Sequence, residues 1–329
     1  MVTKRPHYVP AGYLRAWADN ETVCCRRRDR ANSFPTNVKN LAVEAGIYGT
    51  GSLGQAREDM FRQTEDAWPA LRRRLTSTGD LHGNDRTVVA LFTAIQLIRT
   101  RESLARSNFI ADAAASTDER PISPAAIRRF LREQHLGFEP NNAEVEAAWT
   151  MVQYATDQDN PPSRDEMLSI MLEVAVTELA PRLEKMQWTV EHCSVPMLMT
   201  SDRPVMMWRR PNSNGDPPEE GIGLANADEI RLPLAPSELL VIAHQKRSTT
   251  PLRFGPKRFR AVNRHTAAQC YEFAAGTVQQ KHRLDELNLA GRSPVLRFNI
   301  APGYQQIGQG AEPTGNDIIH TWIPYSEER

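Results

Sequence analysis

The chain has 329 residues, of which 40% are hydrophobic, and its 40 basic side chains balance 40 acidic ones. This length allows one large domain or two ordinary ones, and the zero net charge argues against a strong overall field toward nucleic acid or an anionic membrane. The four cysteines fit neither a disulfide framework nor a zinc-site spacing. No run is apolar enough to cross a bilayer and no signal peptide is recognisable, so we expect a cytoplasmic protein with no membrane partner.

Helices dominate the first half of the chain. Apolar periodicity predicts helices over 10–18, 55–75, 84–115, 123–137, 142–157 and 163–186. Pro10 suits the first position of its helix, Asn84 fits an N-cap, and Ser163 with Glu166 forms a capping box. Pro69 is expected to kink or split the second helix.

From Gln187 onward the pattern changes to short β-rich segments bounded by turns. Strands are expected over 187–193, 197–202, 204–210, 229–236, 238–244 and 294–300, in addition to an early strand over 21–28. One late helix is predicted over 258–278, a long loop over 211–228, and a poorly ordered tail over 301–329.

These elements predict an α+β fold, in which a mainly helical N-terminal part packs on a C-terminal antiparallel sheet with one late helix. The first part spans 1–186 and includes a short strand, and the second spans 187–300. Because the N-terminal part also contains a strand, the alternative is that the two parts form one interlocked domain.

Several polar residues fall within apolar helix faces. Arg99 lies in the middle of the apolar stripe of the helix over 84–115, with Gln96 at the edge of that stripe. A buried guanidinium needs an acceptor, and Glu65 flanks the apolar face of the helix over 55–75. The pattern predicts either a structural Glu65–Arg99 ion pair or an arginine that holds an anionic ligand.

Three further positions are ambiguous in the same way. His7 lies between two prolines that restrict the backbone, so its ring is either simply packed or held as a general base or metal ligand. Asp202, preceded by Ser201, sits between two β segments, where it serves as a turn residue, a metal ligand or a base. Asn263 faces inward on the late helix, where it either ties down a loop or contacts a ligand.

Several stretches together resemble the domain of unknown function 4238 family (DUF4238). Members of this family begin with His-x-x-Pro-x-x-Tyr-Leu-x-x-Phe, a pattern matched here by His7, Pro10, Tyr13 and Leu14, with Trp17 in place of the phenylalanine. The stretches NVKNLAVEAGIYG, QLIRTRESLAR, TSDRPV, LPLAPSELLVI and NRHTAAQCYEFAAG follow in the expected order. The resemblance covers residues 5–276 and supports a grouping of His7, Gln96, Arg99, Asp202 and Asn263, but it supplies no reaction.

The favoured hypothesis is a hydrolase that acts on a phosphate-containing substrate, in its narrower version a metal-dependent nuclease. His7, Glu65, Arg99 and Asp202 are the candidate catalytic residues, with Arg99 offsetting the developing phosphate charge. His7 and Asp202 are candidate ligands of Mg²⁺ or Mn²⁺. Gln96, Ser201 and Asn263 are candidate substrate contacts, and local arginine clusters would guide a nucleic acid or nucleotide.

Two other interpretations stay open. The same polar set would serve a non-catalytic ligand-binding or sensing protein, for example in a defence or toxin–antitoxin locus, with a homo-oligomer compatible with either function. Alternatively, each residue only satisfies a buried neighbour. The functional hypotheses depend on His7, Arg99 and Asp202 meeting in one cavity.

Overall fold

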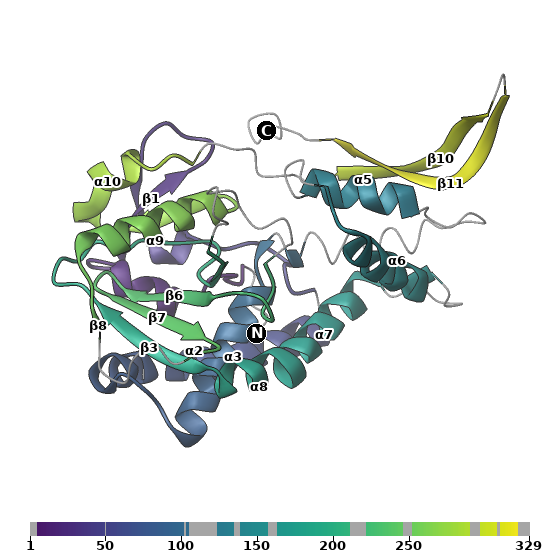
Figure 1. Cartoon of the computed structure of the whole chain (residues 1–329). Helices are drawn as coiled ribbons and strands as arrows, with labels where there is room; N and C mark the ends of the chain where they lie inside the picture. Colours follow the sequence, from purple (N-terminus) through teal and green to yellow (C-terminus); the bar gives the residue numbers. More distant parts are fainter. Residues whose placement is uncertain are drawn as a thin grey trace. The chain divides into compact units, whose positions relative to one another are not determined.

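The structure is a computed structural model. It describes residues 5–49, 51–101, 103–104, 124–134, 139–156, 163–210, 222–245, 252–289, 297–307 and 310–321. The chain forms two compact units (Figure 1). The first comprises Met1–Ser103, Met171–Arg209 and Ile222–Gly291, and the second comprises Leu104–Ile170, Arg210–Gly221 and Arg292–Arg329. The boundary between the units therefore differs from the expected division after residue 186.

Helices near the N-terminus build one side of the first unit. They are α1 (Ala11–Leu14), η1 (Arg15–Trp17), α2 (Gly51–Thr78) and α3 (Gly83–Ile98). Pro69 lies inside α2 without splitting it. The helix expected over 84–115 is interrupted, because Arg99 leaves the helical conformation as the C-cap of α3. Residues 101, 103 and 104 are helical again, and residues 102 and 105–115 lie outside the described part of the chain.

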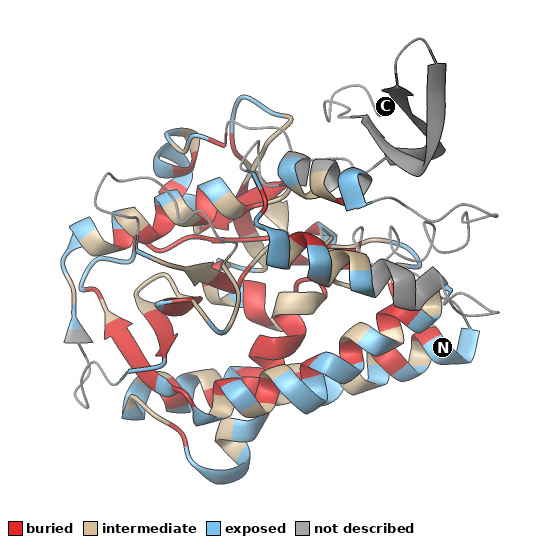
Figure 2. Ribbon diagram, turned by 45° about the vertical axis from the view of Figure 1, so that its right-hand side comes forward, coloured by how far each residue is buried: buried red, intermediate tan, exposed pale blue. Residues whose placement is uncertain are grey.

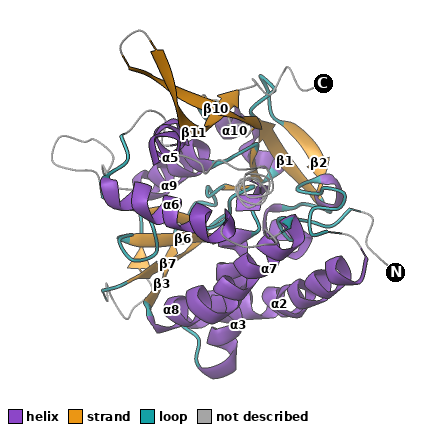
Figure 3. Ribbon diagram, turned by 90° about the vertical axis from the view of Figure 1, so that its right-hand side faces the viewer, coloured by secondary structure: helices purple, strands orange, loops and turns teal. Residues whose placement is uncertain are grey.

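The segment predicted as a helix over 163–186 is helical from Arg164 to Lys185 but changes its pitch. α7 (Arg164–Val174) passes through a π-helical turn, η3 (Ala175–Leu179), into α8 (Ala180–Lys185). The capping box is confirmed, since the Ser163 N–H donates to Glu166 Oε2 at 2.7 Å and the Glu166 N–H donates to Ser163 Oγ at 3.3 Å. α3 packs against both α2 and α8 (Figure 3).

Two sheets complete the first unit. The five-stranded sheet has the order β5 (Met206–Trp208), β6 (Glu229–Ala235), β7 (Glu238–Ala243), β3 (Gln187–His192) and β8 (Leu252–Arg253). It is antiparallel except between β3 and β8, and Figure 2 shows its central strands as buried. The four-stranded antiparallel sheet has the order β2 (Phe34–Asn37), β1 (Thr22–Arg27), β9 (Phe273–Gly276) and β4 (Thr200–Ser201).

The late helix is shorter than expected. α9 (Pro256–Gln269) ends at Cys270, whose backbone is extended. The residues that follow form β9, which pairs with β1 on one side and β4 on the other. An apolar run such as Phe273–Gly276 fits a helix or a buried strand equally well, so the sequence alone did not separate them. The short elements η2 (Val38–Asn40), η4 (Val278–Gln280) and α10 (Lys281–Asp285) complete this unit.

An aromatic cluster links the N-terminal helices to both sheets. The rings of Trp68 and Phe92 stack with centroids 4.0 Å apart, and the Tyr13 ring lies 6.0 Å from that of Trp68. The Tyr13 hydroxyl donates to the Pro233 carbonyl at 2.8 Å in β6. Trp17 Nε1 donates to the carbonyl of Leu198 at 2.9 Å. The early helices therefore pack directly against segments from the later, β-rich part of the chain.

The second unit contains α5 (Pro124–Gln134), α6 (Asn142–Thr156) and a long hairpin. The hairpin pairs β10 (Arg297–Ile307) with β11 (Gly310–Thr321) in antiparallel register. It lies where a poorly ordered tail was expected from residue 301. Pro302 and Gly303 interrupt the strand pattern in the sequence, and the register shifts directly after Gly303; this explains why the pattern was not recognised.

Two expectations fall partly outside the described residues. Of the long loop over 211–228, only 222–228 is described, and of the helix over 123–137, residues 135–137 are not. Among the helices in the described ranges, none combines the length and the apolar character that a membrane span needs.

Candidate functional site

Arg99 is the hub of a hydrogen-bonded cluster at the end of α3. Its side chain is only 2% exposed. Its Nε donates to the Tyr48 hydroxyl at 2.9 Å, one terminal nitrogen donates to Glu65 Oε1 at 2.5 Å, and the other donates to the His7 carbonyl. The guanidinium also lies 4.5 Å from the centroid of the Phe61 ring. The predicted Glu65–Arg99 ion pair is therefore confirmed.

The cluster keeps Arg99 charged although it is buried. Burial acts to lower the pKa of Arg99, but the neighbouring Tyr48 and Glu65 outweigh it, and the pKa lies above its ordinary value. Burial also raises the pKa of Tyr48 to about 12, so its hydroxyl stays protonated and donates to the His7 carbonyl at 2.9 Å. The guanidinium thus fixes the segment before α1, residues 5–10, against α2 and α3. We call this segment the N-terminal arm.

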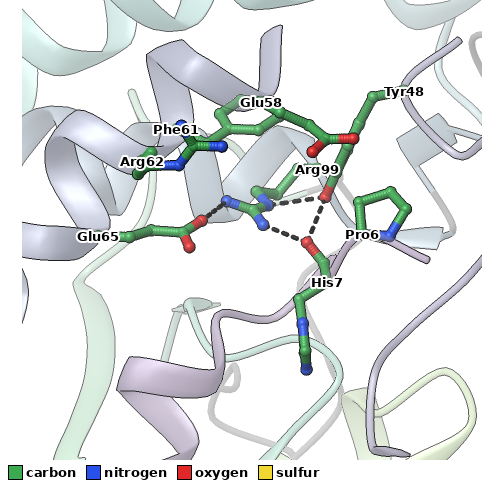
Figure 4. Close-up of a pocket in the computed structure, with 8 residues that line it drawn as sticks. All are labelled: Pro6, His7, Tyr48, Glu58, Phe61, Arg62, Glu65 and Arg99. Carbon is green, nitrogen blue, oxygen red and sulfur yellow. Dashed lines mark hydrogen bonds and ion pairs between the residues drawn. The ribbon is translucent and has the colours of Figure 1, made fainter. Parts of the chain in front are cut away.

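A pocket of about 150 Å³ opens beside this cluster (Figure 4). It is lined by Pro6, His7, Tyr48, Glu58, Phe61, Arg62, Glu65 and Arg99. Four of these side chains come from α2, where their spacing of three and four residues places them on one face. The other walls come from the N-terminal arm, the loop before α2 and the end of α3.

One charge on the pocket wall has no counterpart. Arg99 pairs with Glu65, and Arg62 pairs with Asp59 at 2.9 Å. In the part of the chain that the structure describes, the Glu58 carboxylate has neither an ion pair nor a hydrogen bond, and it lies on the Tyr48 side of the pocket (Figure 4). The lining as a whole has two carboxylates and two guanidinium groups, and Glu58 is the carboxylate among them that has no pairing partner within the described residues.

The His7 ring contacts Val38, whereas the His7 carbonyl contacts Arg99. His7 Nε2 lies 3.1 Å from the Val38 carbonyl. Because a carbonyl only accepts, Nε2 carries the proton and Nδ1 keeps its lone pair in the neutral ring. Burial lowers the pKa of His7 below its ordinary value, which favours that neutral ring at neutral pH. The ring points away from the guanidinium, toward which only the His7 carbonyl is turned (Figure 4).

Asp202 does not join this pocket, contrary to the convergence that the functional hypotheses required. Its side chain is 1% exposed, and its carboxylate accepts from the backbone N–H of Tyr271 at 2.9 Å and from that of Glu272. These bonds hold the turn after β4 against the start of β9. The geometry matches the turn-residue interpretation of Asp202.

The buried carboxyl of Asp202 predicts a measurable pH dependence. Burial raises its pKa to about 7, above the ordinary value of 3.8. A raised folded-state pKa gives stability that is complete below the unfolded pKa and is lost as the pH rises through the folded value. Between about pH 5 and pH 8, the wild type should lose roughly 2–4 kcal/mol relative to Asp202→Asn. Urea unfolding of both proteins at the two pH values measures this, and an identical pH effect in the variant would contradict it.

The three residues that were expected to contact the substrate do not line this pocket. Ser201 Oγ donates to the Arg203 carbonyl at 3.0 Å and accepts from the Arg203 N–H at 3.1 Å, which closes a tight turn. Asn263 accepts from the Met199 N–H at 2.9 Å and donates to the Met197 carbonyl at 2.7 Å, so it ties down a loop as one interpretation predicted. Gln96 is buried, and neither of its amide atoms has a hydrogen-bond partner among the residues that the structure describes.

Metal binding gains no support from the geometry. Among the described residues, no group of three or more His, Cys, Asp or Glu side chains is arranged to hold a metal ion. His7 and Asp202 do not line the same pocket. Their role as ligands of Mg²⁺ or Mn²⁺ therefore stays a prediction.

Sequence reasoning missed two groups of residues. Tyr48, Glu58 and Arg62 line the pocket, and the helical spacing of Glu58, Arg62 and Glu65 was the available signal. The second group is a buried charge network beneath α9. Glu229 pairs with both Arg231 and Arg258, Arg258 also pairs with Glu191 at 3.0 Å, and Arg231 lies 3.4 Å from His265 Nδ1.

Fold and pocket together define an α+β protein with a small charged pocket between its N-terminal arm and its first long helices. A family model described as Protein of unknown function (DUF4238) matches residues 5–279, and the chain belongs to this family. The match contains every residue that lines the pocket and ends before the β10–β11 hairpin. No curated protein and no solved structure matches the chain.

Proposed function

We propose that the protein is a ligand-binding or sensing protein whose pocket takes a small molecule with a protonated amine or guanidine group. The carboxylate of Glu58 carries this proposal, because it lines the pocket and no side chain in the described part of the chain pairs with it. Charge complementarity selects the ligand: a cation would pair with Glu58, whereas an anion would be repelled by it. The pocket volume of about 150 Å³ suits a head group of a few atoms.

The pocket is also preformed. Arg99 joins the N-terminal arm, the Tyr48 loop and α2 through its three hydrogen bonds. A ligand that enters does not have to order these segments, so little binding energy is lost to reorganisation. The Phe61 ring and Pro6 add apolar surface to the same walls.

Methylguanidinium is a suitable probe of this proposal. We expect it to bind and to raise the melting temperature, with acetate and methyl phosphate producing no shift. Glu58→Gln should weaken methylguanidinium binding by about tenfold, since it removes the carboxylate expected to pair with the probe. The matched control is Asp66→Asn, which changes an exposed carboxylate elsewhere on α2 and should leave binding unchanged. Equal affinity in the wild type and in Glu58→Gln would refute the proposal.

Hydrolysis of a phosphate-containing substrate is the second candidate. It is favoured by His7, whose neutral ring is fixed by Val38 while Nδ1 has no partner in the described residues and could accept a proton. Glu58 and Glu65 would repel a phosphate unless a divalent cation accompanied it, in line with the Mg²⁺ or Mn²⁺ expected from the sequence. A nucleotide or nucleic acid substrate, a homo-oligomer and a role in defence remain predictions from the sequence.

The two candidates are separated by turnover. Phosphate-ester hydrolysis is measured with p-nitrophenyl phosphate and bis(p-nitrophenyl) phosphate, with and without Mg²⁺ or Mn²⁺. Hydrolase function predicts release of p-nitrophenol and a loss of about 100-fold or more in His7→Gln. Binding of methylguanidinium with no turnover of either ester supports the sensing function instead.

A further inference from the structure

A second cavity in the first unit, of about 410 Å³, lies at the C-terminal end of α8. It is lined by Arg182, Lys185, Met186, Leu224, Ala225 and His244. Its ionisable lining residues are all basic, and its other lining residues are apolar. The volume falls within the range of roughly 300–1,000 Å³ typical of small-molecule sites. This combination fits a ligand that has both an acidic group and an apolar body.

The basic side chains are not needed to cap α8, which is the ordinary role of Lys and Arg at the C-terminal end of a helix. Arg86 already donates to the carbonyl of Glu184 at 2.8 Å and to that of Met186 at 2.6 Å. Trp188 Nε1 donates to the carbonyl of Leu183 at 2.9 Å. The carbonyls of the last helical turn are therefore largely satisfied before Lys185 is considered.

The basic side chains beside the cavity have few partners within the described residues. Lys185 has no ion pair or hydrogen bond within the described residues. Arg182 pairs with Glu178 at 3.0 Å, but both side chains are more than half exposed. Exposed pairs of this kind contribute little and exchange partners easily. An anion in the cavity could therefore recruit both basic side chains.

The opposite wall is held in place by its own hydrogen bonds. His244 Nε2 lies 3.0 Å from the Leu224 carbonyl and links the end of β7 to the loop over 222–227. Within that loop, the Gly223 N–H donates to Asn226 Oδ1 at 2.7 Å, and the Ala227 N–H donates to the Gly223 carbonyl at 3.0 Å. These hydrogen bonds thus hold the apolar wall formed by Leu224 and Ala225 in a defined position.

We propose that this cavity binds a small organic anion, with a carboxylate or phosphate group between Arg182 and Lys185. The apolar body of the ligand packs on Met186, Leu224 and Ala225. The residues involved are distinct from those of the Arg99 pocket, and the opposite sign of the charge predicts opposite ligand preferences at the two sites. The inference does not depend on the proposed function of the Arg99 pocket.

The test uses the full chain with three probes of similar size: phenyl phosphate, benzoate and benzyl alcohol. Binding is measured by isothermal titration calorimetry on the wild type, on the double variant Arg182→Gln/Lys185→Gln and on Leu224→Glu. The control is Lys257→Gln, which removes an exposed lysine on α9 that does not line the cavity. Melting temperatures show that each variant remains folded.

We expect at least one of the two anions to bind and benzyl alcohol to bind much more weakly. The double variant should lower the affinity by about fivefold to tenfold, because each partly screened charge contributes modestly, and Lys257→Gln should leave it unchanged. Leu224→Glu should abolish binding by placing a carboxylate in the wall. A preference between phenyl phosphate and benzoate identifies the acidic group. Absence of binding by both anions, or equal affinity in the wild type and the double variant, would overturn the proposal.

Discussion

Replacing Arg99 with methionine is expected to destabilise the protein by about 3–5 kcal/mol, the range observed when one partner of a buried ion pair is removed. Methionine retains the apolar stem but removes the guanidinium donor from Glu65 Oε1, the Tyr48 hydroxyl and the His7 carbonyl, although the carbonyl keeps its hydrogen bond from the Tyr48 hydroxyl. Urea unfolding followed by tryptophan fluorescence measures the loss, since Trp17 and Trp68 belong to the adjacent core.

Two control variants show whether the destabilisation by Arg99→Met comes from loss of the buried guanidinium. Tyr48→Phe removes a single hydroxyl from the cluster and should cost about 1–2 kcal/mol. Arg62→Met removes an exposed arginine from the same pocket and should cost less than about 1 kcal/mol. If Arg99→Met cost no more than Arg62→Met, the guanidinium would not hold the N-terminal arm in place.

Glu229→Gln is expected to have the second-largest effect, about 3 kcal/mol or more at neutral pH. Glu229 is 2% exposed and pairs with Arg231 and Arg258. Burial acts to raise the pKa of Glu229, but the two arginines outweigh it and bring the value to about 2. Arg258 retains Glu191 in the variant, whereas Arg231 is left with its contacts to His265 and to the Trp208 ring, which lies 4.2 Å away.

The pH dependence of Glu229→Gln follows from the lowered pKa. A depressed folded-state pKa gives stability that is present above the unfolded value and is lost as the pH falls through the folded value. The gap in unfolding free energy between the wild type and Glu229→Gln should therefore shrink as the pH falls from about 4.5 toward 2. Urea unfolding across this range measures it, with Asp66→Asn as an exposed control. A gap that stays constant with pH would contradict the assigned role.

The sequence predicted the fold class and most helices because their signals are local. Capping at Ser163 and the apolar periodicity of α2 depend only on residues within a few turns. The boundary errors occurred where tertiary pairing decides the outcome. Phe273–Gly276 became a strand because β1 and β4 lie on either side of it, and no local pattern records those neighbours.

Only part of the candidate site could be predicted from the sequence. The Glu65–Arg99 ion pair could be predicted because an arginine within an apolar stripe requires an acceptor. His7 was singled out as a base or metal ligand, and that role stays a prediction; its contact to Arg99 comes from its backbone carbonyl, which any residue could supply. The role of Asp202 could not be predicted, because an inward carboxylate that binds backbone amides has the same sequence pattern as a catalytic one.

The central claim is that the pocket beside Arg99 receives the cationic group of a small ligand. The most direct measurement is the set of intermolecular nuclear Overhauser effects between the methyl protons of bound methylguanidinium and the protein. We predict effects to the ring protons of Phe61 and Tyr48, which line the pocket together with Glu58. Bound methylguanidinium that shows effects only to residues outside this pocket, or no bound probe at all, would contradict the claim.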